Sequence, residues 1–358
     1  MRYFLLLAAV ATIVLGYVAY YFQVEQGVRD GVVAWVEMRR QQGIEAGYDG
    51  LASRGFPFRV VVELDAPRLA APSAPGAPAW QGRRLSGVIQ PWNLEHLILD
   101  LSGDGEVSFA QSGRRLAYAV EQGLASVEGG AGRLARLAVD LGEVSLSEAA
   151  TAVRLTTARL QFHLRPGERP SGLWRLTYKA ERSRIEAEGT SPLGITVGVL
   201  GPEIALAMVE VTLNGRHQSS NGMAAATVAE VVARWRDTGG SAEINRFKLS
   251  WGTLDVEADG TLSLDAEMRP IGALTARVRG HGKLIEALVR TRLMAPAAAN
   301  GARAVLDLLA KAGGGVLAVP LTLQNGVLSL GPVALARLSP LLRRDGRSPV
   351  LPSPARRR

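Results

Sequence analysis

Five apolar runs follow one another in the middle of the chain: LEHLILDLSG (residues 94–103), GRRLAYAVEQG (113–123), RLARLAVDLGEVSL (133–146), AVRLTTARLQFHL (152–164) and LWRLTYKAE (173–181). Their spacing of roughly ten residues is typical of an antiparallel β-meander. Any one run taken alone also fits a short buried helix, above all where alanine is frequent. As a set they predict an α+β body dominated by strands, in which twisted antiparallel sheets carry a few packing helices.

A hairpin is predicted near the end of the chain, in PLTLQNGVLSLG (320–331). A two-residue Asn325-Gly326 turn sets Leu323 against Leu328 and places residues 321 and 330 opposite each other. Asn-Gly is the dipeptide that a tight hairpin turn favours, because both of its residues tolerate positive φ.

A second hairpin is predicted in TLDVEADGTLSLD (253–265). A three-residue loop at Ala258, Asp259 and Gly260 would pair Leu254 with Leu264 and residue 256 with residue 262. A two-residue loop would instead set an apolar side chain opposite Ser263, so the longer loop is favoured.

Other segments predict helices, a further strand and a linker. Apolar positions with helical spacing occur in residues 24–42, 223–236, 283–294 and 302–312, with glycines at 43, 239–240 and 313–315 to end them and Pro296 between the last two. Residues 59–64 (RVVVEL) have the two-residue period of a half-buried strand. Residues 70–79 contain three prolines and predict a loop or short linker.

The N-terminus carries a candidate membrane anchor. Tyr3 to Phe22 reads YFLLLAAVATIVLGYVAYYF, a run of about twenty residues without a charge, which is long enough to cross a bilayer as a helix. A cleaved signal peptide is the alternative, but the aromatic end of the run offers no small-x-small cleavage site. Arg2 precedes the run whereas charges of both signs follow it, so the bias favours an N-terminus on the cytoplasmic side. The sequence therefore predicts a single-pass inner-membrane protein with its bulk in the periplasm.

The expected organisation has four parts. These are an anchor at 1–23, a first β-rich half-domain at 24–195, a second α+β half-domain at 196–340 and a disordered basic tail at 341–358. The join between the half-domains is expected near Ser191 to Pro202. A length of 358 residues allows two ordinary domains.

Composition excludes several kinds of chemistry. The chain has no cysteine, which removes disulfides, thiolate metal sites and cysteine nucleophiles. The net charge of +8 could suggest a polyanion partner, but the arginines are scattered along the chain or gathered in its tail, so no nucleic-acid partner is expected. With 40 glycines and 6% aromatic residues, many short elements joined by turns are more plausible than a bundle of long helices.

No catalytic, cofactor-binding or metal-binding residues are predicted, and ligand-binding residues remain unknown. The four histidines, at positions 96, 163, 217 and 281, are far apart in sequence, and no HExxH, phosphate-loop or GxSxG motif occurs. The acid pairs Asp104 with Glu106 and Glu186 with Glu188 resemble a glycosidase pair, but residues two apart on a strand are better explained as a solvated face. Four of the tryptophans, at positions 92, 174, 235 and 251, are interpreted as core residues.

Two motifs carry a family resemblance. GFPF (55–58), within residues 47–69, and QPWN (90–93), within 89–103, resemble the DUF2125 family of uncharacterised alphaproteobacterial envelope proteins. The resemblance extends from the anchor to about Leu341 and implies no activity. In architecture alone, the anchor followed by repeated strands is similar to AsmA-like envelope proteins, whose troughs shield lipid acyl chains.

Two functions remain open on this basis. The first is a non-enzymatic envelope-maintenance protein whose sheet leaves one apolar face to bind lipid acyl chains. The second is a structural or protein-interaction module that tethers other envelope proteins at the membrane surface through an apolar patch or strand addition. An enzyme with dispersed acidic residues is the weakest of the alternatives, and no cofactor is expected.

Overall fold

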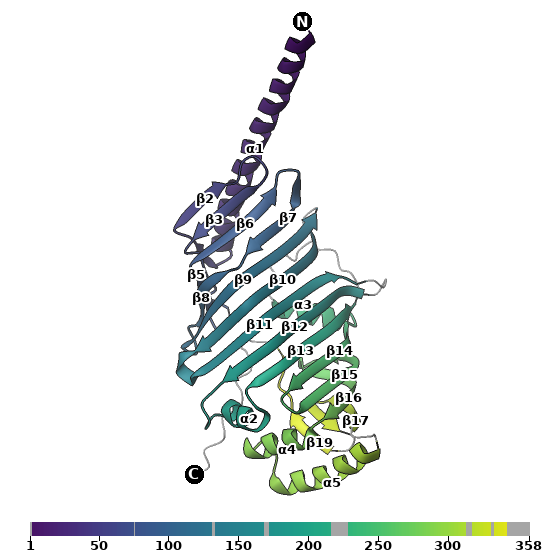
Figure 1. Ribbon diagram of the computed structural model, residues 1–358. Coiled ribbons are helices and arrows are strands. Elements are labelled where there is room, and N and C mark those ends of the chain that lie inside the picture. The colour runs from purple at the N-terminus through teal and green to yellow at the C-terminus, as the bar shows by residue number, and fades with distance from the viewer. Residues whose placement is uncertain are drawn as a thin grey trace.

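The computed structural model describes residues 2–74, 76–130, 133–167, 172–215, 228–312, 317–330 and 333–341. Within these ranges the chain forms one antiparallel sheet of nineteen strands with a long helix at its N-terminal end and shorter helices toward the other end (Figure 1). This agrees with the predicted β-dominated α+β class.

Helix α1 (Arg2–Gln41) contains both the apolar run and the helix expected at 24–42. The helix continues through residue 23 without interruption, so the predicted anchor and the predicted helix that follows it form one continuous helix. Gly43 has a φ of +76°, the left-handed conformation with which many helices end. The first half of α1 projects away from the sheet, and its second half lies against it (Figure 1).

The N-terminal part of the sheet has two branches that meet on one strand, β9 (Arg114–Gly130). The first branch pairs in the order β1 (Glu45–Gly47), β4 (Arg68–Ala70), β5 (Pro78–Gly82) and β8 (Gly103–Phe109). The second has the order β2 (Gly50–Arg54), β3 (Val60–Asp65), β6 (Arg84–Gln90) and β7 (Asn93–Asp100). β8 pairs with the first half of β9 and β7 with its second half.

From β9 onward each strand pairs with the next one along the chain. The order is β10 (Arg133–Glu148), β11 (Val153–Pro166), β12 (Gly172–Glu186), β13 (Glu203–Asn214), β14 (Ser241–Trp251), β15 (Leu254–Leu264), β16 (Pro270–Arg279), β17 (Leu317–Gln324), β18 (Val327–Leu330) and β19 (Val333–Arg337). A short 3₁₀ turn, η1 (Ala149–Thr151), joins β10 to β11. All five predicted runs are strands, namely β7, β9, β10, β11 and β12.

The sheet continues without a break from β12 to β13, across the region where the two half-domains were expected to divide. The division itself therefore stays a prediction. Residues 70–79 are mostly a turn, as predicted, although Pro78 and Ala79 already belong to β5. Val60, Val61 and Val62 are all buried, so β3 is covered more completely than a half-buried strand.

Of the two predicted hairpins, the later one is confirmed and the earlier one is wrong. Asn325 and Gly326 have φ values of +52° and +71°, and the register pairs Leu323 with Leu328 as predicted. Residues 254–264, in contrast, form one continuous strand between β14 and β16. Gly260 is needed for close packing rather than for a turn, because a Cβ there would lie 2.3 Å from the carbonyl oxygen of Ala273 on β16.

The helices of the second half differ from expectation mainly at their ends. α3 (Val228–Asp237) covers the described part of the helix predicted at 223–236, and α4 (His281–Arg290) and α5 (Pro296–Ala312) match the predicted pair with shifted bounds. α2 (Pro192–Leu200) was not predicted. Ser191 caps it by accepting a hydrogen bond from the Gly194 amide. The expected disorder after Pro340 and the glycines at 313–315 lie outside the described residues, apart from Leu341.

Candidate functional site

One face of the sheet is apolar from strand to strand. The registers of neighbouring strands align two rows of side chains across it. The first row consists of Leu97, Val127, Leu137, Leu164, Leu176, Val211 and Ile244. The second consists of Leu99, Ala125, Val139, Phe162, Tyr178, Val209 and Phe247. We call this surface the apolar face.

The opposite face is covered by paired charges. Arg159 donates from its Nε to Asp140 over 3.0 Å, and this bond lowers the pKa of that carboxyl. Lys248 forms an ion pair with Glu257 at 2.9 Å across β14 and β15, which lowers the pKa of the Glu257 carboxyl. Such pairs suit a solvated face, where a single ion pair adds little stability. The sheet is therefore amphipathic where these pairs lie, between β10 and β15.

In five neighbouring strands the alternation of side chains between the two faces shifts by one residue, and we call this shift the phase change. It does not interrupt the apolar face. In β10 the side chains on this face are at 137, 139 and 141, and then at 144 and 146; in β12 they are at 176, 178 and 180, followed by Ser183 and Ile185. Glu143 and Arg182, at the points of change, have φ values of +48° and +49°. The registers that join β9 to β13 leave one residue of each strand unpaired, and these residues lie along one line across the sheet. Because all five strands shift together, as an aligned row of bulges would, the face stays continuous.

Two hydroxyl groups lie on the apolar face beside this line. Thr157 and Ser183 are opposite each other on β11 and β12, and both are buried. Their hydroxyl oxygens are 3.0 Å apart, so each satisfies the other. Neither hydroxyl group is therefore left without a partner.

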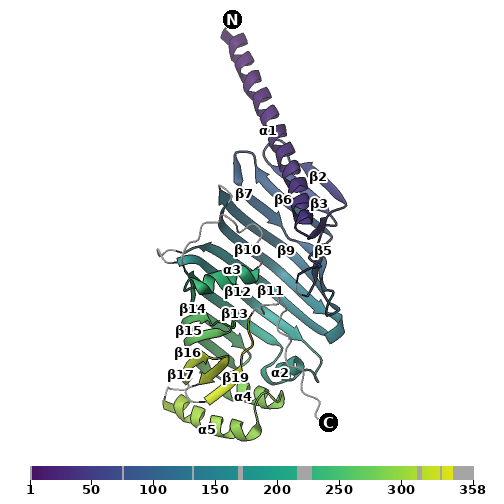
Figure 2. The same ribbon diagram turned by 180° about the vertical axis from the view of Figure 1, so that it is seen from behind.

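Helices cover the apolar face at its two ends. At the N-terminal end, Tyr21 and Val24 of α1 pack on Val60 and Val62 of β3, which the register joins to the first row through Ile89 and Leu97. Figure 2, which looks onto this side, shows α1 lying across the sheet at that end. This packing forms one of the two buried cores of the described structure.

The second core lies at the other end. Leu200 of α2 and Ala310 of α5 pack with Leu254, Ala276 and Leu317 of the sheet. Phe247, which belongs to the second row, borders this core. The same face is therefore closed at both ends by helices.

Between the two cores the large side chains of the apolar face are only half-buried, while smaller ones such as Ala125 and Thr157 are buried. Neither core contains a residue of β10 or β11. Phe162, Leu164, Leu176 and Tyr178 keep intermediate exposure, which is what neighbouring strands alone provide. Of the described helices, α3 is the one seen between the two cores on this side of the sheet. It lies in front of the sheet in Figure 2 and behind it in Figure 1.

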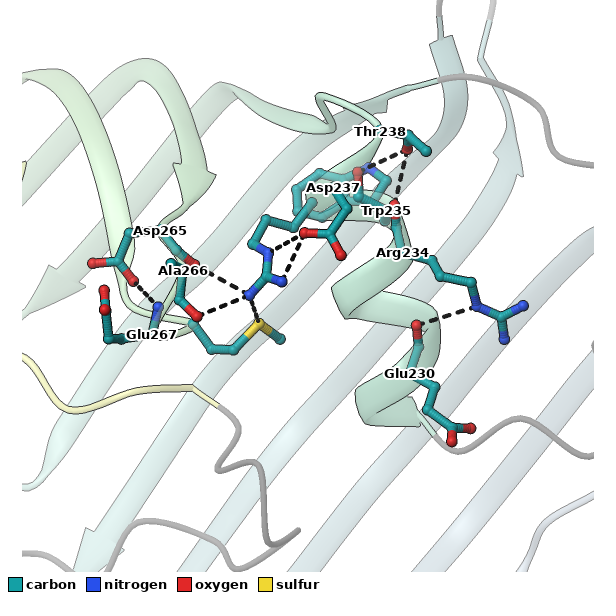
Figure 3. A network of polar contacts seen from close by, with 10 residues as sticks. Glu230, Arg234, Trp235, Asp237, Thr238, Asp265, Ala266 and Glu267 are labelled. Atoms are coloured by element: carbon teal, nitrogen blue, oxygen red, sulfur yellow. Dashed lines mark hydrogen bonds and ion pairs between the residues drawn. The ribbon is translucent and has the colours of Figure 1, made fainter.

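α3 is held at its C-terminal end by a small polar network (Figure 3). Trp235 donates from its indole N–H to the carbonyl oxygen of Asn214, at the end of β13, over 2.9 Å. The guanidinium of Arg236 donates to the carbonyl oxygen of Ala266 over 3.1 Å and pairs with Asp237 at 2.7 Å. α3 is thereby fixed to the end of β13 and to the loop between β15 and β16.

The three described histidines lie on different elements, each with its own neighbours. His96 is hydrogen-bonded to Ser126 at 2.8 Å, and His281, the first residue of α4, to Asp307 at 2.9 Å. His163 lies on β11 opposite Thr177, and His217 lies outside the described residues. Within the described ranges, no group of three or more histidine or acidic side chains is arranged to hold a metal ion.

The acid pairs have local partners. Asp104 pairs with Arg83 at 3.1 Å and Glu106 with Arg115 at 3.9 Å. Glu186 pairs with Arg184 at 3.5 Å, and Glu188 accepts a hydrogen bond from the Thr190 hydroxyl. These contacts fit the interpretation of a solvated surface.

Three of the four tryptophans, at positions 174, 235 and 251, are half-buried, and of these Trp251 packs against the second core. Trp251 donates from its indole N–H to the carbonyl oxygen of Gly201 over 2.8 Å, which secures the end of α2. Trp92, in the turn between β6 and β7, is 61% exposed, so its interpretation as a core residue is wrong.

Helix α1 is long and apolar enough to span a membrane. Its most apolar window of eighteen residues has a mean hydropathy of 2.1, and none of that window is buried in the rest of the structure. A single N-terminal helix of this kind is consistent with single-pass anchoring.

The comparisons assign the chain to a family. The family model described as "uncharacterized protein conserved in bacteria (DUF2125)" matches residues 22–339, which include both motifs that carry the resemblance in sequence. Comparison with curated proteins and with solved structures gave no match. The match begins where the apolar run of α1 ends and covers nearly all of the sheet. The chain therefore belongs to the DUF2125 family.

Proposed function

We propose that the protein is a non-enzymatic, membrane-anchored envelope protein that shields lipid acyl chains on its apolar face. The observation that carries the proposal is the apolar face itself, which is closed by helices at both ends and half-exposed over β10 and β11. A continuous apolar surface that the described structure leaves half-buried is a candidate site for a partner. Acyl chains fit this surface because most of its side chains are apolar, and each buried methylene contributes about 0.8 kcal/mol.

The proposal places the body of the protein in the periplasm. Arg2 and the terminal amine precede the apolar run, whereas Glu25, Arg29 and Asp30 follow it with nearly balanced charge, which favours a cytoplasmic N-terminus. A reporter enzyme that is active only outside the cytosol, fused after Pro340, should be active. Activity of a cytosol-dependent reporter at that position would contradict the orientation.

The acyl-chain proposal can be tested because the chain has no cysteine of its own. Phe162→Cys and Tyr178→Cys place a single thiol on the apolar face, and Gln161→Cys and Thr177→Cys place one on the opposite face of the same strands. Each variant carries a thiol-linked photocrosslinker and is irradiated in its native membrane. We expect lipid adducts, identified by mass spectrometry, from positions 162 and 178 and several-fold fewer from 161 and 177.

The outcomes distinguish the two functions. Equal lipid labelling on both faces, or none on either, would overturn acyl-chain binding. A reproducible protein adduct confined to positions 162 and 178 would favour the interaction module that tethers partners through the same face.

A further inference from the structure

Three tyrosines near the end of the apolar run tie α1 to two loops of the body. The hydroxyl of Tyr17 donates to the carbonyl oxygen of Pro57, that of Tyr20 to Pro91 over 2.6 Å, and that of Tyr21 to Arg59 over 3.0 Å. Pro57 lies in the GFPF loop and Pro91 in the QPWN turn. Positions 17, 20 and 21 share one side of a helix, so both loops dock on the same side of α1.

The loops present large apolar side chains that the described structure leaves exposed. The exposed fractions are 52% for Phe56, 71% for Phe58, 61% for Trp92 and 54% for Leu94. Phe22, itself 55% exposed, stacks on Phe56 with ring centroids 5.9 Å apart. We call these five residues the collar. Because they are exposed, these residues are not part of a core; they lie on one side of α1 with their surfaces outward.

The collar lies at a defined level along α1. Its loops are bonded to positions 17 to 21, and the apolar run ends at Phe22. With a rise of 1.5 Å per residue, Tyr17 lies about 7.5 Å before Phe22 along the helix axis. If α1 crosses a bilayer from Tyr3, the last turns of the run lie at the boundary between headgroups and acyl chains, about 5–10 Å deep. Aromatic side chains are enriched at this boundary.

We propose that the collar inserts into the interfacial layer of the bilayer that α1 crosses, and so fixes the orientation of the sheet relative to the membrane surface. We assign the lipid surface as the occupant because the collar is continuous with the apolar run. Its loops are bonded to the last turns of that run and therefore lie at the same level along α1. A single helix leaves the attached body free to tilt and rotate, whereas inserted contacts on two loops restrict both motions. This inference rests on α1 and two loops, and stands apart from acyl-chain binding on β10 to β12.

Depth measurements on the full chain test the collar directly. Phe58→Cys and Leu94→Cys introduce single thiols on the two loops, and Leu293→Cys, 73% exposed just after α4, is the matched control. Each is labelled with an environment-sensitive fluorophore and reconstituted in vesicles of phosphatidylethanolamine and phosphatidylglycerol. We expect positions 58 and 94 to be quenched by lipids that carry a quencher on the shallow part of the acyl chain. Quenching by aqueous iodide should be several-fold weaker there than at position 293.

Two results would overturn the proposal. Iodide quenching at positions 58 and 94 as strong as at 293 would show that the collar lies in water. Protection from both iodide and the lipid quencher would show that a protein or a second copy of the chain covers it. Neither result depends on whether the apolar face binds acyl chains.

Discussion

The hydroxyl of Tyr20 donates a hydrogen bond of 2.6 Å to the carbonyl oxygen of Pro91, seventy-one residues further along the chain. This bond joins the apolar helix to the turn between β6 and β7. Tyr20→Phe should lower the free energy of unfolding by roughly 0.5–1.5 kcal/mol, the usual net contribution of one hydrogen bond. It should also speed amide exchange in residues 90–93, measured in reconstituted protein. Tyr3→Phe, at a position 90% exposed, should change neither quantity.

The docking of α1 determines where the chain can be shortened. A chain that begins at Tyr17 loses most of the apolar run but keeps all three docking tyrosines. We expect alkaline extraction to release it from membranes, because the remaining segment is too short to span. Its unfolding should stay cooperative.

A chain that begins at Gln23 also loses Tyr21, which is 1% exposed in the core with Val24 and Val60. Removing a fully buried aromatic side chain should destabilise the body by roughly 3–5 kcal/mol relative to the longer truncation. Chemical denaturation of both proteins measures the difference. Equal stability would mean that the contact of Tyr21 with the body is weak in solution.

A charge on the apolar face should reduce lipid binding. Tyr178→Lys places an ammonium group between Phe162 and Val209, and we expect lipid labelling from a crosslinker at position 162 to fall several-fold. Thr177→Lys, on the opposite face of the same strand, should leave labelling unchanged. Circular dichroism and thermal unfolding would confirm that both variants stay folded, since a half-exposed lysine can extend its charge to water.

Acid should destabilise the junction of β9, β10 and η1. The Arg114 guanidinium donates to Glu148 over 2.6 Å and Thr151 donates to it over 2.7 Å, and these bonds lower the pKa of the buried Glu148 carboxyl. Because the pKa is lower in the folded state, the stabilisation is complete above the unfolded value of about 4.3 and is lost as pH falls through the folded value. Denaturation measured across this range should show the loss.

Arg114→Gln should raise the pKa of Glu148 and shift that loss to higher pH. It should also cost roughly 1–3 kcal/mol at neutral pH, since a buried carboxylate keeps only part of its hydrogen bonding. Arg83→Gln, which removes an exposed pair with Asp104, is the control and should have little effect. The same pH profile in both variants would argue against Glu148 as the group responsible.

The β17–β18 turn should tolerate no side chain at Gly326. Its φ is +71°, and a Cβ there would lie 3.1 Å from the carbonyl oxygen of Leu338. Gly326→Ala should therefore destabilise the protein by about 1 kcal/mol or more. Gly282→Ala is the matched control, because Gly282 lies in α4 with nothing within 4 Å of an added Cβ. That substitution should be neutral or slightly stabilising.

The sequence predicted those parts of the fold that depend on local pattern. Strand β7 and strands β9 to β12 follow from their apolar runs, and the Asn325-Gly326 turn follows from its dipeptide. Residues 254–264 were misassigned because their alternation fits a hairpin and a continuous strand equally well. The choice is made by β14 and β16, which pair with both sides of β15 and are not visible in the segment itself.

The candidate surfaces were only partly visible in the sequence. An open apolar face was predicted because the sequence contains many alternating strands and few helices to cover them. The extent of the face depends on where the helices pack. The shift of apolar positions from 141 to 144 in β10 is a signal of the phase change that the sequence itself carries. The collar could not be inferred, because it needs Tyr17 and Tyr20 to lie beside loops that are 40 and 71 residues away in sequence.

The order of the strands after β9 determines how far the sheet extends from α1. Each strand contacts only its sequence neighbours, so one added or removed hairpin would preserve the direction of every other strand. If α1 crosses a bilayer, the distance that the sheet reaches from it depends on the number of strands, each of which adds at most about 4.8 Å. The length of such a sheet is therefore an adjustable dimension.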